Sequence, residues 1–421
     1  MNYQEAIDYI HSASWLGMKL GLERIRELLL LMGNPQDKLK IVHVAGTNGK
    51  GSTCEMLSRT LEESGFKTGL FVSPFIRTFN ERMQINHRLI SDEELASTAT
   101  YVKNFTDIMK CQPSEFEIVT AIAFEYFYRN KCDYVVMEVG LGGRLDATNI
   151  IKKPVLSVIT TIDYDHMQQL GNSLSEIAAE KAGIIKGADV VSYHQEKEVI
   201  EVFERVSEEK RSKLIVADFD EIRYFGHDDK FQFFSYKNGT KYALSLMGEH
   251  QLKNASVVLE SVDVLRNSGI RIPEEAVKSA FKKSFWPGRF EIISKDPLFI
   301  VDGSHNPQGA RAMVDAVKRY YPERQTVTMI GISSNKDIEK IIEIFDEITK
   351  CYVSIEADTY RAIDKEELAV ILRKTGKPVY ISDTIVDGIE KTISLAEDDE
   401  IAISVGSLFT VAEVREYFCR Y

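Results

Sequence analysis

The stretch HVAGTNGKGST, residues 43–53, decides the fold that we expect for this chain. It follows a short β-branched run at residues 41–44 and leads into an amphipathic segment at residues 54–63. Its glycines therefore stand where a buried strand turns into a helix. At such a turn, backbone N–H groups can approach an anion closely, and the helix N-terminus adds a partial positive charge. The stretch predicts a loop that binds phosphate.

Lys50 adds a full positive charge to this loop, but the pattern departs from the usual GxxxxGK[ST] motif. Counting back from Gly49 and Lys50, the first glycine of the motif would fall at Val44. In addition, Ser52 follows an extra Gly51. A glycine-rich turn with a solvated lysine is the alternative interpretation. The order of strand, turn and helix favours a variant phosphate loop.

Size and composition limit the class of protein. The chain has 421 residues, of which 44% are hydrophobic and 28% are charged. It therefore exceeds the size at which one hydrophobic core usually stops growing, and we expect two or more domains. The net charge of -12 argues against a broad basic surface, and hence against nucleic acid or anionic lipid as a partner. Any phosphate must be bound locally.

The cysteines and the N-terminus indicate a cellular compartment. The five cysteines are scattered and lack CxxC spacing, which argues against a disulfide framework or a zinc site and favours a reducing environment. The N-terminal stretch MNYQEAIDYIHSASW is neither a basic-then-apolar signal peptide nor long enough in apolar residues to span a bilayer. We expect a cytoplasmic protein with no membrane partner.

Periodic patterns predict an α/β domain in the first part of the chain. Residues 2–32 read as helical, ended by the GNP turn at residues 33–35. Further strands are expected at residues 68–74, 134–140 and 155–166, and helices at residues 115–128 and after a capping box at Ser173 and Glu176. Alternating strands and helices predict a largely parallel sheet. Residues 75–94 form a long polar connection, here called the polar excursion. Connections of this length in a compact domain usually have a function.

A small antiparallel element and a second domain are expected after this sheet. Residues 222–246 are aromatic-rich, with a hairpin turn at Asn238 and Gly239, and helices follow near GEHQLKNA and PEEAVKSAF. Residues 286–297 read as a hinge. A second, Rossmann-like doubly wound domain is predicted by five short strands, each followed by a helix: FIVDGSHN, TVTMIG, CYVSIE, PVYISD and EIAISVGS. The predicted domains are 1–291, a P-loop-type doubly wound domain with the antiparallel element, and 292–421, an α/β domain.

Polar side chains follow several predicted strands, at the edge where open parallel sheets bind their ligands. Ser73, Glu138 and His166 can form a Mg²⁺ site beside the phosphate loop, because hard cations take oxygen ligands and ATP phosphates complete their shell. Imidazole is a less usual ligand for Mg²⁺. Each residue has an ordinary alternative, as a turn serine, a strand-end carboxylate or a loop histidine. Their convergence beside the loop favours the metal site.

Eight stretches occur along the chain in this order: HVAGTNGKGST, SPFIRTFNER, EVGLGGRLDATN, DYDH, LGNSLSEIAAEKAGI, WPGRFE, DGSHNPQG and GSLF. They resemble the signature stretches of folylpolyglutamate synthase and its relative with dihydrofolate synthase activity, members of the Mur ligase superfamily. The resemblance runs from GLERIRELLLLMGNP to the last helix. It implies ATP-driven amide ligation, in which a folate carboxylate becomes an acyl phosphate and the amine of L-glutamate attacks it. Two domains that close would exclude water from that intermediate.

The resemblance also implies roles for individual residues. It implies magnesium ligation by Ser73, Glu138 and His166, and catalytic roles for Lys50, Lys181, His166, Asp302 and His305. The implied nucleotide contacts are Thr47, Asn48, Gly49, Lys50, Gly51, Ser52, Asn254, Arg289 and Asp302. The implied substrate contacts are Phe75, Arg82, Phe116, Asp146 and Ser407. A helix-face amide at Asn254 and a surface cation at Arg289 remain ordinary alternatives.

Lys181 needs a separate explanation, because an ammonium group would repel Mg²⁺. On spacing alone, beside Glu180 on an apolar helix, it reads as a surface ion-pair residue. The match to AEKAGI implies instead a carbamylated lysine, which is anionic. The implied cofactors are ATP, Mg²⁺ and carbamylated Lys181, with a monovalent cation as a further candidate.

Two other functions compete with this hypothesis. A peptidoglycan-type Mur ligase would act on a uridine nucleotide and would carry more sequence before the phosphate loop than the roughly forty residues here. A P-loop ATPase switch would leave Lys181 and DGSHNPQG unexplained. Because SPFIRTFNER resembles members devoted to polyglutamylation, we expect a reduced folate as the acceptor and L-glutamate as the amine. Dihydropteroate stays open as a second substrate, and we expect a monomer.

Overall fold

The fold comes from a computed structural model that describes residues 1–13, 21–237, 239–357, 359 and 361–419. The chain divides into two compact units. The first unit comprises Met1–Ser245 and Leu252–Phe285, and the second comprises Leu246–Gln251 and Trp286–Tyr421. The predicted division into domains 1–291 and 292–421 stays a prediction. Over the described residues, none of the helices is long and apolar enough to cross a membrane.

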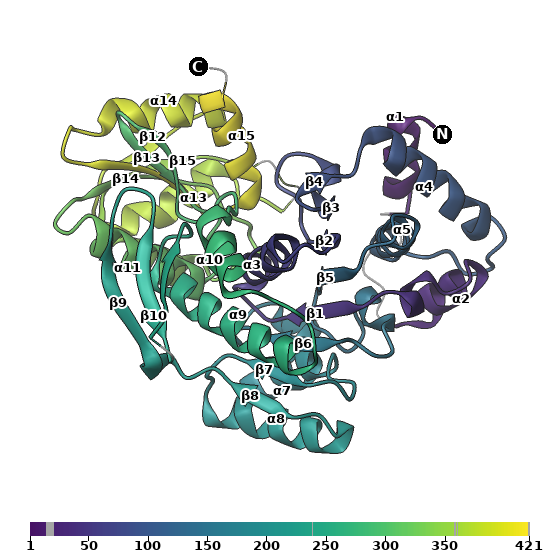
Figure 1. Ribbon diagram of the computed structural model, residues 1–421. Helices are drawn as coiled ribbons and strands as arrows, with labels where there is room; N and C mark the ends of the chain where they lie inside the picture. Colours follow the sequence, from purple (N-terminus) through teal and green to yellow (C-terminus); the bar gives the residue numbers. More distant parts are fainter. Residues whose placement is uncertain (14–20, 238, 358, 360, 420–421) are drawn as a thin grey trace. The chain divides into compact units, whose positions relative to one another are not determined.

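The first unit is built on a mixed sheet with the phosphate loop near its centre (Figure 1). Its strands are β1 (Ile41–Ala45), β2 (Thr68–Phe71), β3 (Met83–Ile85), β4 (Arg88–Leu89), β5 (Tyr134–Glu138), β6 (Leu156–Ile159), β7 (Val190–Ser192) and β8 (Leu214–Val216). They lie in the order β4-β3-β2-β5-β1-β6-β7-β8, and β2, β5, β1, β6, β7 and β8 run parallel to one another. The largely parallel sheet is therefore confirmed, and β3 and β4 form an antiparallel hairpin inside the predicted polar excursion.

Helices cover this sheet. They are α1 (Tyr3–His11), α2 (Glu23–Leu31), α3 (Lys50–Glu63), α4 (Asp92–Thr106), α5 (Glu115–Arg129), α6 (Met167–Leu170), α7 (Leu174–Ala182), α8 (Lys197–Lys210), α9 (Glu249–Asn267), whose first residues belong to the second unit, and α10 (Glu274–Lys283). The helix predicted over residues 2–32 was wrong in extent, because α1 and α2 are separate, and residues 14–20 lie outside the described ones. The capping box of Ser173 and Glu176 at the start of α7 is confirmed.

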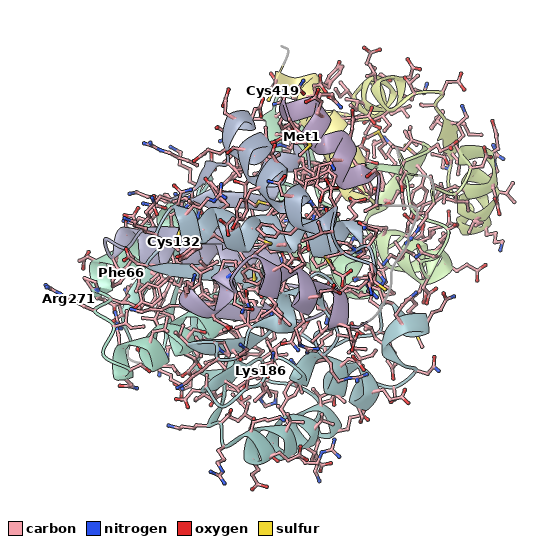
Figure 2. The ribbon with its side chains drawn as sticks, turned by 90° about the vertical axis from the view of Figure 1, so that its right-hand side faces the viewer. Met1, Phe66, Cys132, Lys186, Arg271 and Cys419 are labelled. Carbon is pink, nitrogen blue, oxygen red and sulfur yellow. The ribbon has the colours of Figure 1, made fainter. Side chains whose placement is uncertain are left out.

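Two contacts show how the first unit is tied together. Glu63, at the end of α3, accepts hydrogen bonds from Ser279 Oγ at 2.6 Å and Lys283 Nζ at 2.9 Å, so α10 packs against α3 (Figure 1). Phe66 and Cys132, labelled in Figure 2, lie on one side of the first unit, shortly before β2 and β5 in the sequence. The Phe66 ring meets the Tyr134 ring edge-on, with centroids 4.9 Å apart. These contacts anchor α3, which begins at the phosphate loop.

The antiparallel element is confirmed as a sheet in the order β11-β10-β9, with β9 (Ile222–His227), β10 (Gln232–Tyr236) and β11 (Lys241–Leu244). The turn at Asn238 lies outside the described residues. β7 and β8 were missed by the sequence prediction because each has three residues, too few to show a period.

The second unit contains a sheet in the order β12-β13-β17-β14-β15-β16. Its strands are β12 (Glu291–Lys295), β13 (Leu298–Val301), β14 (Thr326–Ile330), β15 (Thr349–Ser354), β16 (Val379–Ile381) and β17 (Ile401–Val405). Its helices are α11 (Pro307–Tyr320), α12 (Ile338–Phe345), α13 (Lys365–Leu372), α14 (Ile385–Leu395) and α15 (Leu408–Cys419). The predicted strands β13 to β17 are confirmed as a parallel set. Part of the predicted hinge is instead β12, which pairs antiparallel with β13.

Candidate active site

The phosphate loop, residues 46–49 between β1 and α3, is held by the segment that follows β6. Thr47 N donates to Thr161 O at 2.7 Å, and Asn48 N donates to Thr161 Oγ1 at 3.3 Å. In return, Thr160 Oγ1 donates to Asn48 O at 2.7 Å. Two threonines that the sequence prediction did not single out therefore fix the shape of the loop. Their position directly after β6, beside β1, was the signal that could have revealed them.

Two glycines of the loop cannot carry a side chain. Gly46 has a φ of +151°, and a Cβ there would lie 1.8 Å from Thr160 Oγ1. Gly49 has a φ of +83° and caps α3, and a Cβ there would lie 2.6 Å from Asn254 Oδ1. The loop therefore packs directly against Thr160 on one side and the buried Asn254 on the other.

Two lysines converge on one carbonyl oxygen of the loop. Lys50 Nζ donates to Gly46 O at 3.0 Å and to Thr47 O at 3.1 Å. Lys181 Nζ, from the last turn of α7, also donates to Gly46 O at 3.0 Å. Gly51 and Ser52 lie in the first turn of α3, so these cations gather at a helix N-terminus. The arrangement suits a polyphosphate.

Lys181 is buried, with 3% of its surface exposed. Burial, reinforced by repulsion from Lys50, lowers the pKa of its amine to about 7, against the opposing effect of the Asp165 carboxylate. Lys181 is therefore not the surface ion-pair residue that spacing alone suggested. Glu180 Oε1 instead accepts from Arg144 Nη2 at 2.7 Å, because neighbouring helix residues face different directions.

The three residues predicted to bind magnesium follow three strands of the sheet. Ser73 N donates to Glu138 Oε2 at 3.1 Å, so the ends of β2 and β5 are joined directly. Glu138 is buried, with 4% of its surface exposed. His166 lies beyond β6, at the start of α6, with a φ of +51° and its Nε2 3.9 Å from Asp165 Oδ1. Ser73 and Glu138 are brought together, and His166 lies beside Asp165.

Phe75 and Arg82, two of the predicted substrate contacts, lie together beyond β2. The Arg82 guanidinium stands 5.2 Å from the centroid of the Phe75 ring. Arg82 is half-buried, its Nε and Nη1 atoms are buried, and among the described residues these two atoms have no hydrogen-bond partner. Burial lowers the pKa of Arg82, while the carboxylates of Glu115 and Glu138 oppose that shift. A guanidinium with buried, unused donors fits an anionic ligand.

Phe116 and Asp146 each contact residues of the loop that follows β5. Phe116 packs so closely on Gly140 that a Cβ there would lie 2.4 Å from the ring. Asp146 accepts from Leu141 N at 2.9 Å and from Thr148 Oγ1 at 2.5 Å. Burial raises the pKa of the Asp146 carboxyl group. The loop is therefore internally fixed, with an aromatic ring against it.

Four predicted residues gather within the second unit. Asp302 accepts from Phe290 N at 2.7 Å and from Ser304 N at 2.8 Å. The Nδ1–H of His305 donates to Gly303 O at 2.8 Å. A Cβ on Gly303 would lie 2.6 Å from Arg289 Nη1 and 2.2 Å from Leu408, the neighbour of Ser407. Asp302 and His305, after β13, and Ser407, after β17, therefore lie near Arg289, which precedes β12.

Comparison with known proteins identifies the class of enzyme to which this chain belongs. A family model of the Mur ligase middle domain matches residues 44–262, and one of the Mur ligase glutamate ligase domain matches residues 288–408. The chain is 34% identical to the dihydrofolate synthase/folylpolyglutamate synthase of Bacillus subtilis (strain 168), over 98% of each chain. The fold and the matched domains define a Mur-type ligase.

Solved structures show which Mur-type ligases this chain resembles. The fold matches Mycobacterium tuberculosis folylpolyglutamate synthase complexed with ADP and AMPPCP, with a TM-score of 0.91, 29% identity and all of both chains covered. It also matches E. coli FolC in complex with DHPP and ADP, with a TM-score of 0.87, 28% identity, and 100% and 98% of the two chains covered. The chain belongs to the folylpolyglutamate synthase/dihydrofolate synthase family of Mur ligases, and it is an ATP-dependent ligase that forms amide bonds.

Proposed function

We propose that this enzyme joins L-glutamate to the γ-carboxylate of a reduced folate. The observation that carries the proposal is the pairing of two features in the first unit. One is the phosphate loop, where Lys50 and Lys181 share Gly46 O. The other is Arg82, whose guanidinium lies over the Phe75 ring with two buried, unused nitrogen donors, which suits an anionic ligand with an aromatic part. The similar proteins include a dihydrofolate synthase/folylpolyglutamate synthase and a FolC complexed with DHPP and ADP.

The reaction has two steps. A carboxylate oxygen of the acceptor attacks the γ-phosphorus of ATP, the bond to ADP breaks, and an acyl phosphate forms. The amine of glutamate then attacks the acyl carbon, inorganic phosphate leaves, and the amine loses a proton. Lys50 and the N-terminus of α3 stabilise the negative charge that develops on the transferring group. In the second unit, nucleotide contact by Arg289, a catalytic role for His305 and substrate contact by Ser407 stay predictions.

Mg²⁺ fits the donors that the first unit offers. The buried Glu138 carboxylate and the Ser73 hydroxyl would supply oxygen ligands at adjacent strand ends. Within the described ranges, no three His, Cys, Asp or Glu side chains gather into a metal cluster, so phosphate oxygens would have to complete the shell. When bound, Mg²⁺ neutralises charge on the β- and γ-phosphates. His166 as a third ligand and a monovalent cation beside it stay predictions.

Carbamylation of Lys181 is part of the proposal. A neutral amine can attack CO₂ through its lone pair, forming an N–C bond and releasing one proton. Burial lowers the pKa of Lys181 to about 7, so the neutral amine is available near neutral pH. The carbamate would be anionic and would no longer repel a cation at the loop. The expectations of a monomer and of a cytoplasmic location also stay predictions.

The assay that tests the function measures phosphate release with a reduced folate or dihydropteroate, each with and without L-glutamate, at saturating ATP. We expect turnover with the reduced folate only when glutamate is present. Release of phosphate without either substrate would indicate an ATPase switch. Turnover confined to dihydropteroate would overturn the choice of acceptor and leave the ligase chemistry intact.

His305→Ala should lower kcat for ligation by more than about tenfold and change ADP affinity little, because His305 lies in the second unit whereas the phosphate loop lies in the first. Asp302→Ala is a less clean variant, since that carboxylate also accepts two backbone N–H groups. Lys50→Ala is the comparison variant, and we expect it to lose its affinity for ADP. Equal losses of ADP affinity in the His305 and Lys50 variants would contradict these roles.

A further inference from the structure

Two side chains from the segment after β7, Tyr193 and Gln195, contact the residues that pack against the phosphate loop. We propose that both are positioning residues that fix the phosphate loop and Asn254 for ATP, without contacting ATP themselves. The inference deepens the proposed function, because it rests on nucleotide binding at this loop. Neither residue belongs to a motif that the sequence prediction singled out.

Gln195 clamps the backbone that holds the phosphate loop. Its Nε2 donates to Thr160 O at 2.7 Å, and its Oε1 accepts from Ile162 N at 3.2 Å. The Gln195 amide therefore forms hydrogen bonds with the backbone on both sides of Thr161. Thr161 is the residue whose carbonyl and hydroxyl oxygens accept from Thr47 N and Asn48 N. Gln195 thus acts on the loop through a single intervening residue.

Tyr193 fixes the other wall of the loop. Its hydroxyl donates to Asn254 Oδ1, and Asn254 packs directly against Gly49. The donated bond assigns Oδ1 to the tyrosine, so the amide of Asn254 is held in one orientation. The Tyr193 ring is buried and meets the Phe219 ring edge-on at 5.0 Å. Burial raises the pKa of Tyr193 well above its ordinary value, so the phenol stays a donor.

The strand itself keeps both side chains in place. Tyr193 N donates to Ile159 O at 3.0 Å, which continues the parallel pairing of β7 with β6. Tyr193 and Gln195 are two residues apart, yet one reaches Asn254 on α9 and the other the segment after β6. Losing either hydrogen bond should loosen the phosphate loop and weaken ATP binding. The contacts with folate and glutamate should be little affected.

The test uses Tyr193→Phe and Gln195→Met, which keep the size of each side chain. We expect KM for ATP and Kd for ADP to rise about 3- to 10-fold for Tyr193→Phe and about 10- to 100-fold for Gln195→Met, the range for losing one and two hydrogen bonds. KM for L-glutamate should stay within about twofold. A variant that raises all the KM values together, or none, would overturn the positioning role.

Two control variants remove similar bonds elsewhere in the first unit. Tyr242→Phe deletes a buried hydroxyl that donates to Glu274 Oε1 at 2.6 Å. Gln112→Met deletes an amide that donates to Thr106 O and Met109 O, each at 3.1 Å. Both controls should lower thermal stability without changing Kd for ADP. If they weaken ADP binding as much as the test variants do, the effect is general loosening and the proposal fails.

A double-mutant cycle separates Tyr193 from a merely structural residue. If Tyr193 acts through Asn254, then Tyr193→Phe should raise Kd for ADP in the native background and add nothing in an Asn254→Ala background. Independent, additive losses would contradict the proposal. ADP binding is measured directly by calorimetry, so it does not depend on ligation. A wild-type enzyme that binds ADP but ligates no folate would reject the proposed function and leave this test valid.

Discussion

Lys181→Met should abolish ligation while the protein keeps its fold. Methionine fills nearly the same buried volume, and Gly46 O still accepts from Lys50 Nζ when the second lysine is gone. The loss would therefore report on the nitrogen of Lys181 and not on the loop. Turnover and the unfolding temperature of the two proteins are the measurements. An active Lys181→Met variant would remove the carbamate from the mechanism.

Labelled CO₂ can show the modification directly. With ¹³C-bicarbonate, the wild-type enzyme should give a carbamate signal in the NMR spectrum that Lys181→Met lacks. Lys186→Met is the matched control. Lys186 is half-buried, donates to Asn149 O and to Ile151 O at 2.5 Å, and burial lowers its pKa to about 8 (Figure 2). That variant should retain the signal. In Lys181→Ala, a short-chain carboxylic acid should restore part of the activity.

The pKa of Lys181 also sets the direction of the pH dependence. Because the folded-state pKa is lowered to about 7, the amine becomes an ammonium as the pH falls through 7. An ammonium has no lone pair for CO₂, so the carbamate and the ligase activity should both decline on the acid side. Added bicarbonate should shift that decline to lower pH. Activity that is unchanged between pH 6 and 8 would contradict this explanation.

Sequence reasoning found the parts of the site that lie close together in the chain. The glycines, Lys50 and the strand and helix around them form one continuous stretch, so local pattern was enough to predict the phosphate loop. It could not find Thr160 and Thr161, because their hydroxyls reach Asn48 only through the parallel pairing of β1 with β6. β-branched residues after a strand look the same whether or not they support a loop.

Lys181 shows where local pattern misleads. From spacing alone, Lys181 reads as a surface ion-pair residue. In the structure, Glu180 pairs with Arg144, 36 residues earlier, and Lys181 points inward to Gly46 O. Which face of α7 is buried depends on its packing against the sheet, which spacing does not encode. The resemblance to AEKAGI gave the better prediction. Tyr193 and Gln195 had no such signal, since their roles depend on the place of β7 beside β6.

Gly46→Ala should remove measurable ADP binding and with it all ligation. Its Cβ would lie 1.8 Å from Thr160 Oγ1, 2.9 Å from Thr160 Cβ and 3.2 Å from Thr160 Cα, so rotating that side chain cannot relieve the clash. Thr160 would have to move, and it would take with it the hydrogen bond to Asn48 O. The φ of +151° adds backbone strain.

Gly65→Ala separates strain from the clash. Gly65 follows α3 with a φ of +92°, and a Cβ there meets nothing within 4 Å. This variant should lose about 1 kcal/mol of stability and bind ADP normally, since only the strain of a left-handed residue remains. Combining Gly46→Ala with Thr160→Gly should recover part of the ADP affinity, because most of the clash is removed. If Gly46→Ala binds ADP as tightly as Gly65→Ala does, the phosphates are not bound where this loop packs against Thr160.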